Sequence, residues 1–87
     1  MSHLEQKIEH QPVNSRFVLS QGDKECILEY KLVGTSDIKK IDFSSTYVPF
    51  ALRGQGLAEK LVAAGLAWAK EQGYQIEASC WYVKKFL

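Results

Sequence analysis

Three residues that favour anion binding stand directly ahead of a helical pattern beginning at Leu57. They are Arg53, Gly54 and Gly56, within the stretch YVPFALRGQGLAEKLV. Glycine lets a ligand approach the main chain closely, and the first turn of a helix offers free N–H groups and a partial positive charge. Arginine adds forked donors that suit phosphate. We therefore expect a phosphate or pyrophosphate site, the simpler alternative being a glycine-rich turn with a solvated arginine.

Two common phosphate-binding motifs do not fit this loop. The Gly-Lys-Ser/Thr ending of a Walker loop is missing. The glycine spacing also differs from that of the dinucleotide fingerprint, and no buried parallel strand is evident before it. The loop therefore predicts an anion site of another kind.

The bulk composition restricts the class of protein. The chain has 87 residues, 46% of them hydrophobic and 24% charged, and a formal net charge of +1. These values favour one small globular domain and argue against nucleic-acid or membrane-surface binding through bulk charge. No run approaches the roughly 18 apolar residues of a membrane span, and the polar start is unlike a signal peptide. Two cysteines without metal-ligand spacing predict reduced thiols in a cytoplasmic protein.

The N-terminal residues 1–13 are expected to form a flexible tail ahead of a domain that spans residues 14–87. His3 and His10 lie in this tail. A two-histidine metal site is the less favoured interpretation, because no carboxylate or thiol has helpful spacing. We expect no bound metal.

Alternating apolar residues predict four strands, and a helical stripe separates the third from the fourth. The first three are SRFVLS, ECILEYKLV and IKKIDFSSTYV, which we expect to form an antiparallel meander. The stripe begins at Leu57, includes Trp68 as a core anchor and ends with Gly73 as the left-handed cap. The last strand, YQIEASCW, points Ile76, Ala78 and Cys80 inward. A strand–helix–strand crossover makes its two strands parallel, so the fold class is α+β or α/β with a mixed, mostly antiparallel sheet.

This topology predicts where a ligand binds. In open sheets with crossover helices, ligands bind beyond the carboxyl ends of the parallel strands, beside the helix N-terminus. The third strand ends at Tyr47 and Val48, and the fourth ends at Cys80 and Trp81. We expect these ends to meet the loop 53–56 at one place.

The same residues resemble a known family. RGQGLA fits the Arg/Gln-x-x-Gly-x-Gly/Ala signature of the GCN5-related N-acetyltransferases, with Arg53, Gly56 and Ala58 at the defining positions. The longer blocks TYVPFALRGQGLAEKLV and AWAKEQGYQIEASCWYV are similar to the very small acetyltransferase-like branch of that superfamily. The resemblance covers about residues 17–87.

The resemblance implies a minimal acyl-CoA N-acyltransferase-like fold without the paired helices that shape the acceptor pocket in longer members. It implies acetyl-coenzyme A as the ligand, with its pantetheine arm along Tyr47 and Val48. Backbone amides would hold the pyrophosphate, and they belong to Arg53, Gly54, Gln55, Gly56, Leu57 and Ala58.

The resemblance also suggests catalytic roles. The backbone N–H of Val48 is a candidate oxyanion donor, and Tyr82 is a candidate acid for the departing thiolate or else a packed aromatic. Cys80 is either an acyl-accepting nucleophile or a small buried residue, and both interpretations stay open. Cys26, in the middle of a strand, is expected to be structural.

One stretch departs from the family pattern. Relatives often carry His-Thr-Glu-Val before the proline, whereas this chain has Ser45-Thr46-Tyr47-Val48. Two plausible general bases are therefore absent. The carboxylates of Asp42 and Glu77 remain on strands, and we expect both to be solvated.

The leading hypothesis is an acetyl-coenzyme A-dependent N-acetyltransferase that acts on an unidentified amine. The alternative is a coenzyme A-binding module with little or no catalysis and a regulatory or partner-binding role. A small structural domain is a third hypothesis. We expect a monomer or a weak homodimer formed through an exposed sheet edge.

Overall fold

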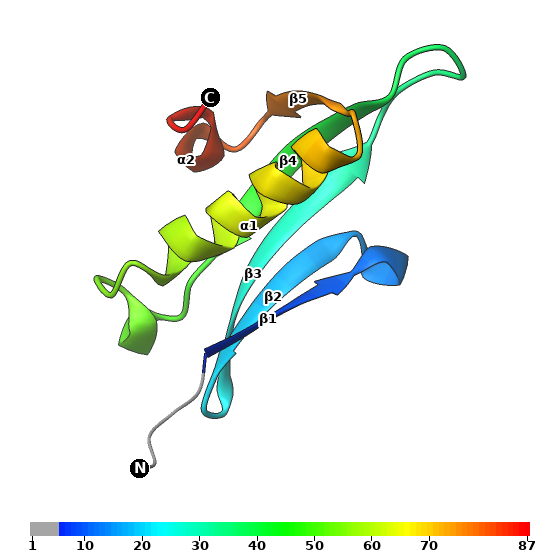
Figure 1. Ribbon diagram of the computed structural model, residues 1–87. Coiled ribbons are helices and arrows are strands. Elements are labelled where there is room, and N and C mark those ends of the chain that lie inside the picture. Colours follow the sequence, from blue (N-terminus) through cyan, green and yellow to red (C-terminus); the bar gives the residue numbers. More distant parts are fainter. Residues whose placement is uncertain (1–5) are drawn as a thin grey trace.

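The computed structural model describes residues 6–87, which form one mixed sheet with a long helix across one face (Figure 1). The five strands lie in the order β1-β2-β3-β4-β5. Their bounds are Gln6–Gln11, Arg16–Gln21, Lys24–Leu32, Lys40–Tyr47 and Gln75–Ala78. The helices are α1, Leu57–Glu71, and α2, Trp81–Lys84, and short 3-10 turns occupy Pro12–Asn14 (η1) and Phe50–Leu52 (η2).

The predicted antiparallel meander and parallel last strand are confirmed, and the sheet has one further strand, β1. Strands β1 to β4 pair antiparallel in sequence order. Strand β5 pairs parallel with β4 after the crossover through α1. The result is an α+β fold with a mixed, mostly antiparallel sheet and one main crossover helix, consistent with an acyl-CoA N-acyltransferase-like fold.

Strand β1 differs from the expected N-terminal tail. It pairs with β2 from Gln6↔Gln21 to Gln11↔Arg16, so the chain is ordered into the sheet well before residue 13. Its sequence, QKIEHQ, has little apolar alternation, which is why the pattern did not indicate a strand. His3 lies outside the described residues.

His10 joins β1 to the core. Its ring stacks on Phe17 at 4.2 Å between centroids and lies 4.5 Å from Trp68, and Nε2 is 2.7 Å from the Tyr30 hydroxyl. Burial lowers the pKa of His10. These contacts explain His10 as a packed residue, and residues 6–87 contain no cluster of three metal-ligating side chains.

Helix α1 packs closely on the sheet because one of its residues has no side chain. A Cβ at Gly65 would lie 2.7 Å from Leu28 Cδ2 and 3.2 Å from Phe43 Cε1. Leu61 and Val62 are fully buried in the same layer, and Trp68 packs against it. Gly73, with φ 79°, follows the helix end in the left-handed conformation, as predicted. The stripe read from the sequence is therefore the face that α1 buries.

Strand β4 contains an irregularity that reverses its faces. Tyr30 pairs with Phe43, but Glu29 pairs with Ser45, so Ser44 is an extra residue on β4. A one-residue bulge exchanges the side chains that point to each face. Beyond it, Thr46 lies opposite the buried Leu28 and therefore faces α1.

Strand β5 is shorter than predicted and ends before Cys80. Both the backbone N–H and the hydroxyl of Ser79 donate to the carboxylate of Asp42, each at 2.7 Å. The chain then enters α2, for which Cys80 is the N-cap. The predicted inward alternation of the strand holds at Ala78, which is buried, but does not extend to Cys80. No helix among residues 6–87 has the length and apolar character needed to cross a membrane.

Candidate functional site

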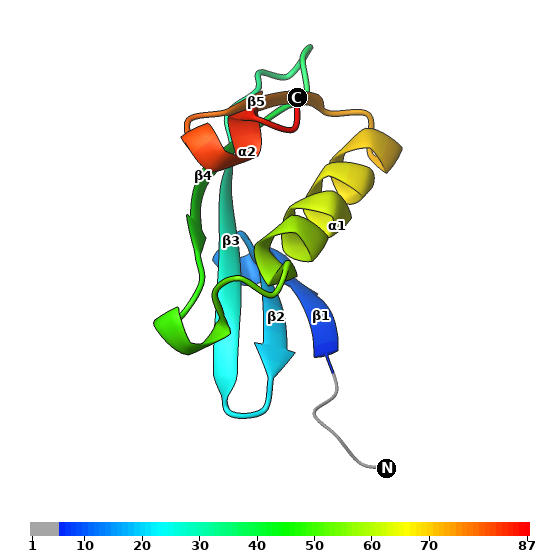
Figure 2. The ribbon, with the colours of Figure 1, turned by 90° about the vertical axis from the view of Figure 1, so that its left-hand side faces the viewer.

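A cavity of about 740 Å³ lies between the second half of β4, the loop before α1 and the start of α2. Figure 2 shows η2 and α2 at opposite ends of this part of β4, with α1 alongside. The cavity brings together most of the residues singled out from the sequence: Tyr47, Val48, Arg53, Gly54, Gly56, Leu57, Ala58, Cys80 and Tyr82. As predicted, the end of β4 and the residues that follow β5 lie beside the loop 53–56.

The cavity forms where β4 and β5 stop pairing and diverge. Their parallel ladder runs only from Lys40↔Gln75 to Phe43↔Ala78. The bulge at Ser44 follows at once, and β5 gives way to α2. The second half of β4 therefore has no strand beside it on that edge, and the cavity lies there.

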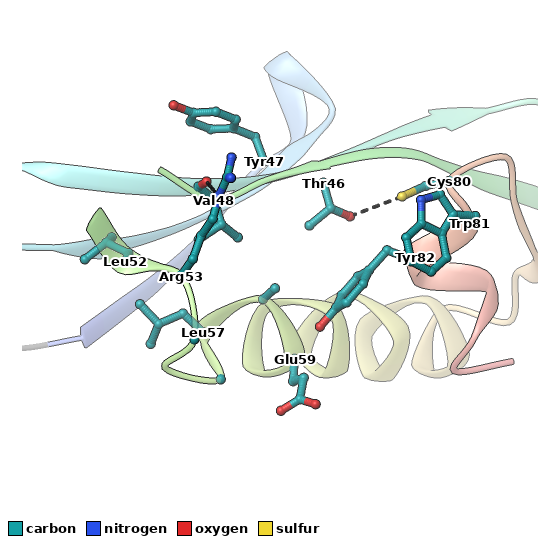
Figure 3. A pocket seen from close by; sticks show the side chains of 13 residues that line it. Thr46, Tyr47, Val48, Leu52, Arg53, Leu57, Glu59, Cys80, Trp81 and Tyr82 are labelled. Atoms are coloured by element: carbon teal, nitrogen blue, oxygen red, sulfur yellow. Dashed lines mark hydrogen bonds between the residues drawn. The ribbon is translucent and has the colours of Figure 1, made fainter. Parts of the chain in front are cut away.

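The bulge decides which side chains of β4 enter the cavity. Thr46 points toward α1, whereas the Tyr47 ring lies on the other side of β4 and is 55% exposed (Figure 3). Tyr47 therefore contributes backbone to the lining rather than its phenol. Thr46 was missed as a site residue because a bulge has no clear sequence signal in SSTY.

The loop before α1 exposes main chain to the cavity. Gly54 and Gly56 have φ angles of 81° and 75°, a region that disfavours residues with a Cβ. A Cβ at Gly54 would meet nothing within 4 Å, so the space beside it is open. Gly56 is the N-cap of α1, and within the described chain no side chain caps the helix by a hydrogen bond. The first-turn N–H groups are thus available to an anion.

Arg53 provides the cation expected at this end, but one of its donors is engaged. Its Nε donates to the Val48 carbonyl at 3.0 Å, and its guanidinium lies 5.8 Å from the Phe50 ring centroid. The contact fixes the guanidinium beside β4. The terminal nitrogens of the fork supply the donors that suit a phosphate oxygen.

Gln55 is the one predicted cofactor residue outside the cavity lining. Its amide oxygen accepts a hydrogen bond from Gln21 at 3.3 Å, and its amide nitrogen donates to the Ala51 carbonyl at 3.4 Å. The side chain therefore braces the loop against the β2–β3 hairpin. Only the backbone of Gln55 remains a candidate for ligand contact.

Cys80 lies at the wall of the cavity formed by α2. Its Sγ is 3.5 Å from the Thr46 hydroxyl (Figure 3). Burial raises the pKa of the thiol, but the Thr46 hydroxyl and the nearby backbone N–H groups of Val83, Tyr82 and Thr46 outweigh burial and lower it. Within the described residues, the Cys80 side chain makes no capping hydrogen bond at the start of α2. The arrangement therefore makes the thiolate, which is the reactive form of cysteine, easier to form than in a free thiol.

The second cysteine behaves differently. Cys26 has no exposed surface, and burial raises the pKa of its thiol. This confirms the structural interpretation of Cys26. Both cysteines are free.

Tyr82 extends from α2 toward α1 and lines the cavity (Figure 3). Burial, and then the negative charge of Glu59, raise the pKa of its phenol. The phenol therefore keeps its proton at neutral pH, as a hydrogen-bond donor or acid must. The raised pKa also makes complete transfer of that proton to a thiolate less favourable.

Glu59 is the only carboxylate that lines the cavity among the described residues, and it was not predicted from the sequence. It stands three residues after Gly56, where a glutamate often folds back toward a helix N-terminus. Its Oε1 lies 3.6 Å from the position that a Gly56 Cβ would take. That spacing was the signal that could have identified it.

The two strand carboxylates considered from the sequence are engaged elsewhere. Asp42 accepts the two hydrogen bonds of Ser79, and Glu77 forms an ion pair with Lys40 at 3.3 Å. Asp42 is thus a structural residue rather than the solvated charge that was expected. Neither carboxylate lines the cavity.

Comparison with known proteins agrees with this geometry. Residues 16–87 match the family described as GCN5-related N-acetyl-transferase. Protein NATD1 of Bos taurus is 31% identical over 83 residues, which are 93% of this chain and 71% of the relative. Protein NATD1 of Homo sapiens is 30% identical with the same coverage of both chains, 93% and 71%. Protein NATD1 of Xenopus tropicalis is 34% identical over 61 residues, which are 70% of this chain and 53% of the relative.

The family match includes β2 to β5, both helices and every residue that lines the cavity. The fold, the glycine loop and the sequence comparison thus agree, and the chain belongs to the GCN5-related N-acetyl-transferase family.

Proposed function

We propose that the protein is an acetyl-coenzyme A-dependent N-acetyltransferase that acts on an amine. The observation that carries this proposal is the sharing of one cavity by the open N-terminus of α1 and the thiol of Cys80. The first feature suits a pyrophosphate, and the second offers a polarisable or nucleophilic group for acyl chemistry.

The residues present fit the cofactor. The positive φ angles of Gly54 and Gly56 leave main-chain N–H groups accessible, and Arg53 adds a cation beside them. The backbone of Tyr47 and Val48, at the end of β4, would bind the pantetheine arm. When bound, acetyl-coenzyme A supplies an activated acetyl thioester.

The chain's own groups then have separate roles. Val48, just beyond the last pair of the β3–β4 ladder, is the candidate backbone donor to an oxyanion. Tyr82 holds a proton at its hydroxyl for the departing thiolate. Cys80 keeps two candidate roles, because its lowered pKa favours a nucleophile while its packing against the core suits a structural residue.

The alternative, a coenzyme A-binding module, is favoured by one specific observation. Among residues 6–87 the cavity is lined by no histidine, and its single carboxylate, Glu59, is exposed. Removal of a proton from the amine therefore depends on Glu59 or on solvent. The acceptor, the oligomeric state and the cytoplasmic location stay predictions.

Binding is tested by titrating coenzyme A into the labelled protein and following backbone amide shifts. We expect changes from Gly54 to Ala58 and none at Gly73, a second glycine of positive φ at the far end of α1. Arg53→Gln should weaken binding about 10- to 100-fold, since a hydrogen bond to a charged group is lost. Lys70→Gln, which removes one cation from the last turn of α1, should leave binding unchanged. Absence of shifts in the glycine loop would refute the cofactor site.

Catalysis is tested separately by intact mass after incubation with acetyl-coenzyme A. A stable or transferable acetyl adduct that disappears in Cys80→Ala supports the nucleophile. Turnover that persists in Cys80→Ala assigns Cys80 a structural role and supports direct transfer to the amine. Tight binding of coenzyme A without turnover on any amine favours the binding module.

A further inference from the structure

Strand β1 forms the longer of the two open edges of the sheet. It is an outer strand and, within residues 6–87, pairs only with β2 (Figure 1). Alternate N–H and C=O groups along its other side are therefore free of strand pairing. The opposite edge is shorter, since β5 has four residues and β1 has six. An open edge of this kind can bind a further strand through its main chain.

The side chains of β1 carry the two faces of the sheet to this edge. Ile8 lies opposite Leu19, so it extends the buried layer that packs against α1, yet it is 41% exposed. Lys7 and Glu9 point to the other face, and both are exposed. Neither forms an ion pair in the part of the chain that the structure describes. The edge thus presents an apolar side chain on one face and two opposite charges on the other.

The order of these residues fits a second copy of the same strand. When two copies of β1 run antiparallel with Ile8 opposite Ile8, Lys7 of each copy lies opposite Glu9 of the other. Directly opposed side chains have Cβ atoms about 4.5–5.5 Å apart, which is close enough for an ion pair. The two copies therefore complement each other in charge on one face and in apolar contact on the other.

Neighbouring registers lose this match. A slip by two residues in either direction keeps the faces together but places Lys7 opposite Lys7, or Glu9 opposite Glu9. A slip by one residue exchanges the faces and puts Ile8 opposite a charged side chain. Like charges directly opposite one another are destabilising in a sheet. Of these registers, the one centred on Ile8 is the only one that opposes unlike charges.

We propose that two copies of the chain pair through β1 in this register and form a symmetric dimer with one continuous sheet. The same strand serves both copies, as a two-fold axis requires, and both α1 helices lie on the same face. The dimer is independent of the proposed function, because no described residue of β1 lines the cavity. A contact of one strand from each copy is small beside the about 1,200–2,000 Å² of stable interfaces, so the dimer forms reversibly at high concentration.

Sedimentation velocity of the full chain over a series of concentrations tests whether the dimer forms. We expect a reversible shift from monomer to dimer as the concentration rises. Backbone amide signals of β1 should move over the same series, and those of β5, at the other edge, should not. A monomer at every concentration would overturn the proposal, and so would signals that move at β5 rather than at β1.

Charge reversal tests the register. Lys7→Glu and Glu9→Lys should each weaken self-association at least about 10-fold, since every opposed charge pair becomes repulsive. Lys24→Glu makes the same change of charge at an exposed position of β3 and should have little effect. Equal weakening by Lys24→Glu would show a general effect of net charge and overturn the pairing.

Two combinations should restore the dimer. A chain that carries both Lys7→Glu and Glu9→Lys again places unlike charges opposite one another. An equimolar mixture of the two single variants does the same between unlike chains, so it should associate although neither variant does so alone. Restoration in both experiments supports the register centred on Ile8. Failure of the double variant and of the mixture to associate would overturn it.

Discussion

Substitution of Gly65 by alanine tests the close packing that sets the distance between α1 and the sheet. The new Cβ would lie 2.7 Å from Leu28 Cδ2 and 3.2 Å from Phe43 Cε1. Leu28 and Phe43 have no exposed surface, so neither can move into solvent. Either α1 must move away from the sheet or the two side chains must leave their preferred rotamers.

Two opposing terms set the size of the effect. Alanine favours the helix over glycine by up to about 1 kcal/mol. Overpacking a filled core costs about 1–3 kcal/mol. We therefore expect Gly65→Ala to lower the free energy of unfolding by about 1 kcal/mol, with a fall in Tm of roughly 4–8 °C for a domain of this size.

Urea denaturation followed by circular dichroism measures the effect. Ala67→Gly, at an exposed position of the same helix, measures the propensity term separately and should cost about 1 kcal/mol. Leu28→Val shortens the side chain nearest to the new methyl group. Combined with Gly65→Ala it should cost less than the sum of the two single variants.

The reasoning is refuted if Gly65→Ala stabilises the protein by the amount that Ala67→Gly destabilises it. That result would mean that the helix gains its propensity term and meets no steric resistance. If the packing argument holds, Gly65→Ala should also weaken coenzyme A binding under conditions where the variant is folded. The reason is that α1 carries the glycine loop at its N-terminus.

Three further predictions concern titrating side chains. Thr46→Val should slow alkylation of Cys80 about threefold at neutral pH, since the loss of the hydroxyl raises the pKa of that thiol, while Ser45→Ala on the opposite face should not. Tyr82→Phe should lower acetyl transfer by about 100-fold with coenzyme A affinity unchanged; because the pKa of Tyr82 is raised, activity should show no loss from its ionisation between about pH 6 and 9. Burial lowers the pKa of His10 from 6.5, so the neutral ring contributes to stability above pH 6.5 and that contribution is lost as pH falls. The free energy of unfolding should therefore change less between about pH 7.5 and pH 5 in His10→Phe than in the unmodified protein.

Much of the fold could be predicted because its elements have simple periodicities. Alternation marked β2, β3 and the first half of β4, and the helical stripe marked α1. The crossover rule then placed the strand ends and the glycine loop at one site. Strand β1 could not be predicted from alternation. It is held in the sheet by backbone pairing with β2 and by the contacts of one residue, His10, with rings that are distant in the sequence.

The bulge in β4 explains why the sequence located the cavity but missed Thr46 as one of its side chains. Strict alternation from Ile41 and Phe43 would place Ser45 and Tyr47 on the face of α1. The extra residue Ser44 reverses this order and puts Thr46 there instead. The resemblance led us to expect a glutamate at position 47, where the Tyr47 side chain points away from the cavity (Figure 3). A carboxylate at this position would therefore lie outside the space beside Cys80, where the hydroxyl of Thr46 is the side chain in contact with the thiol.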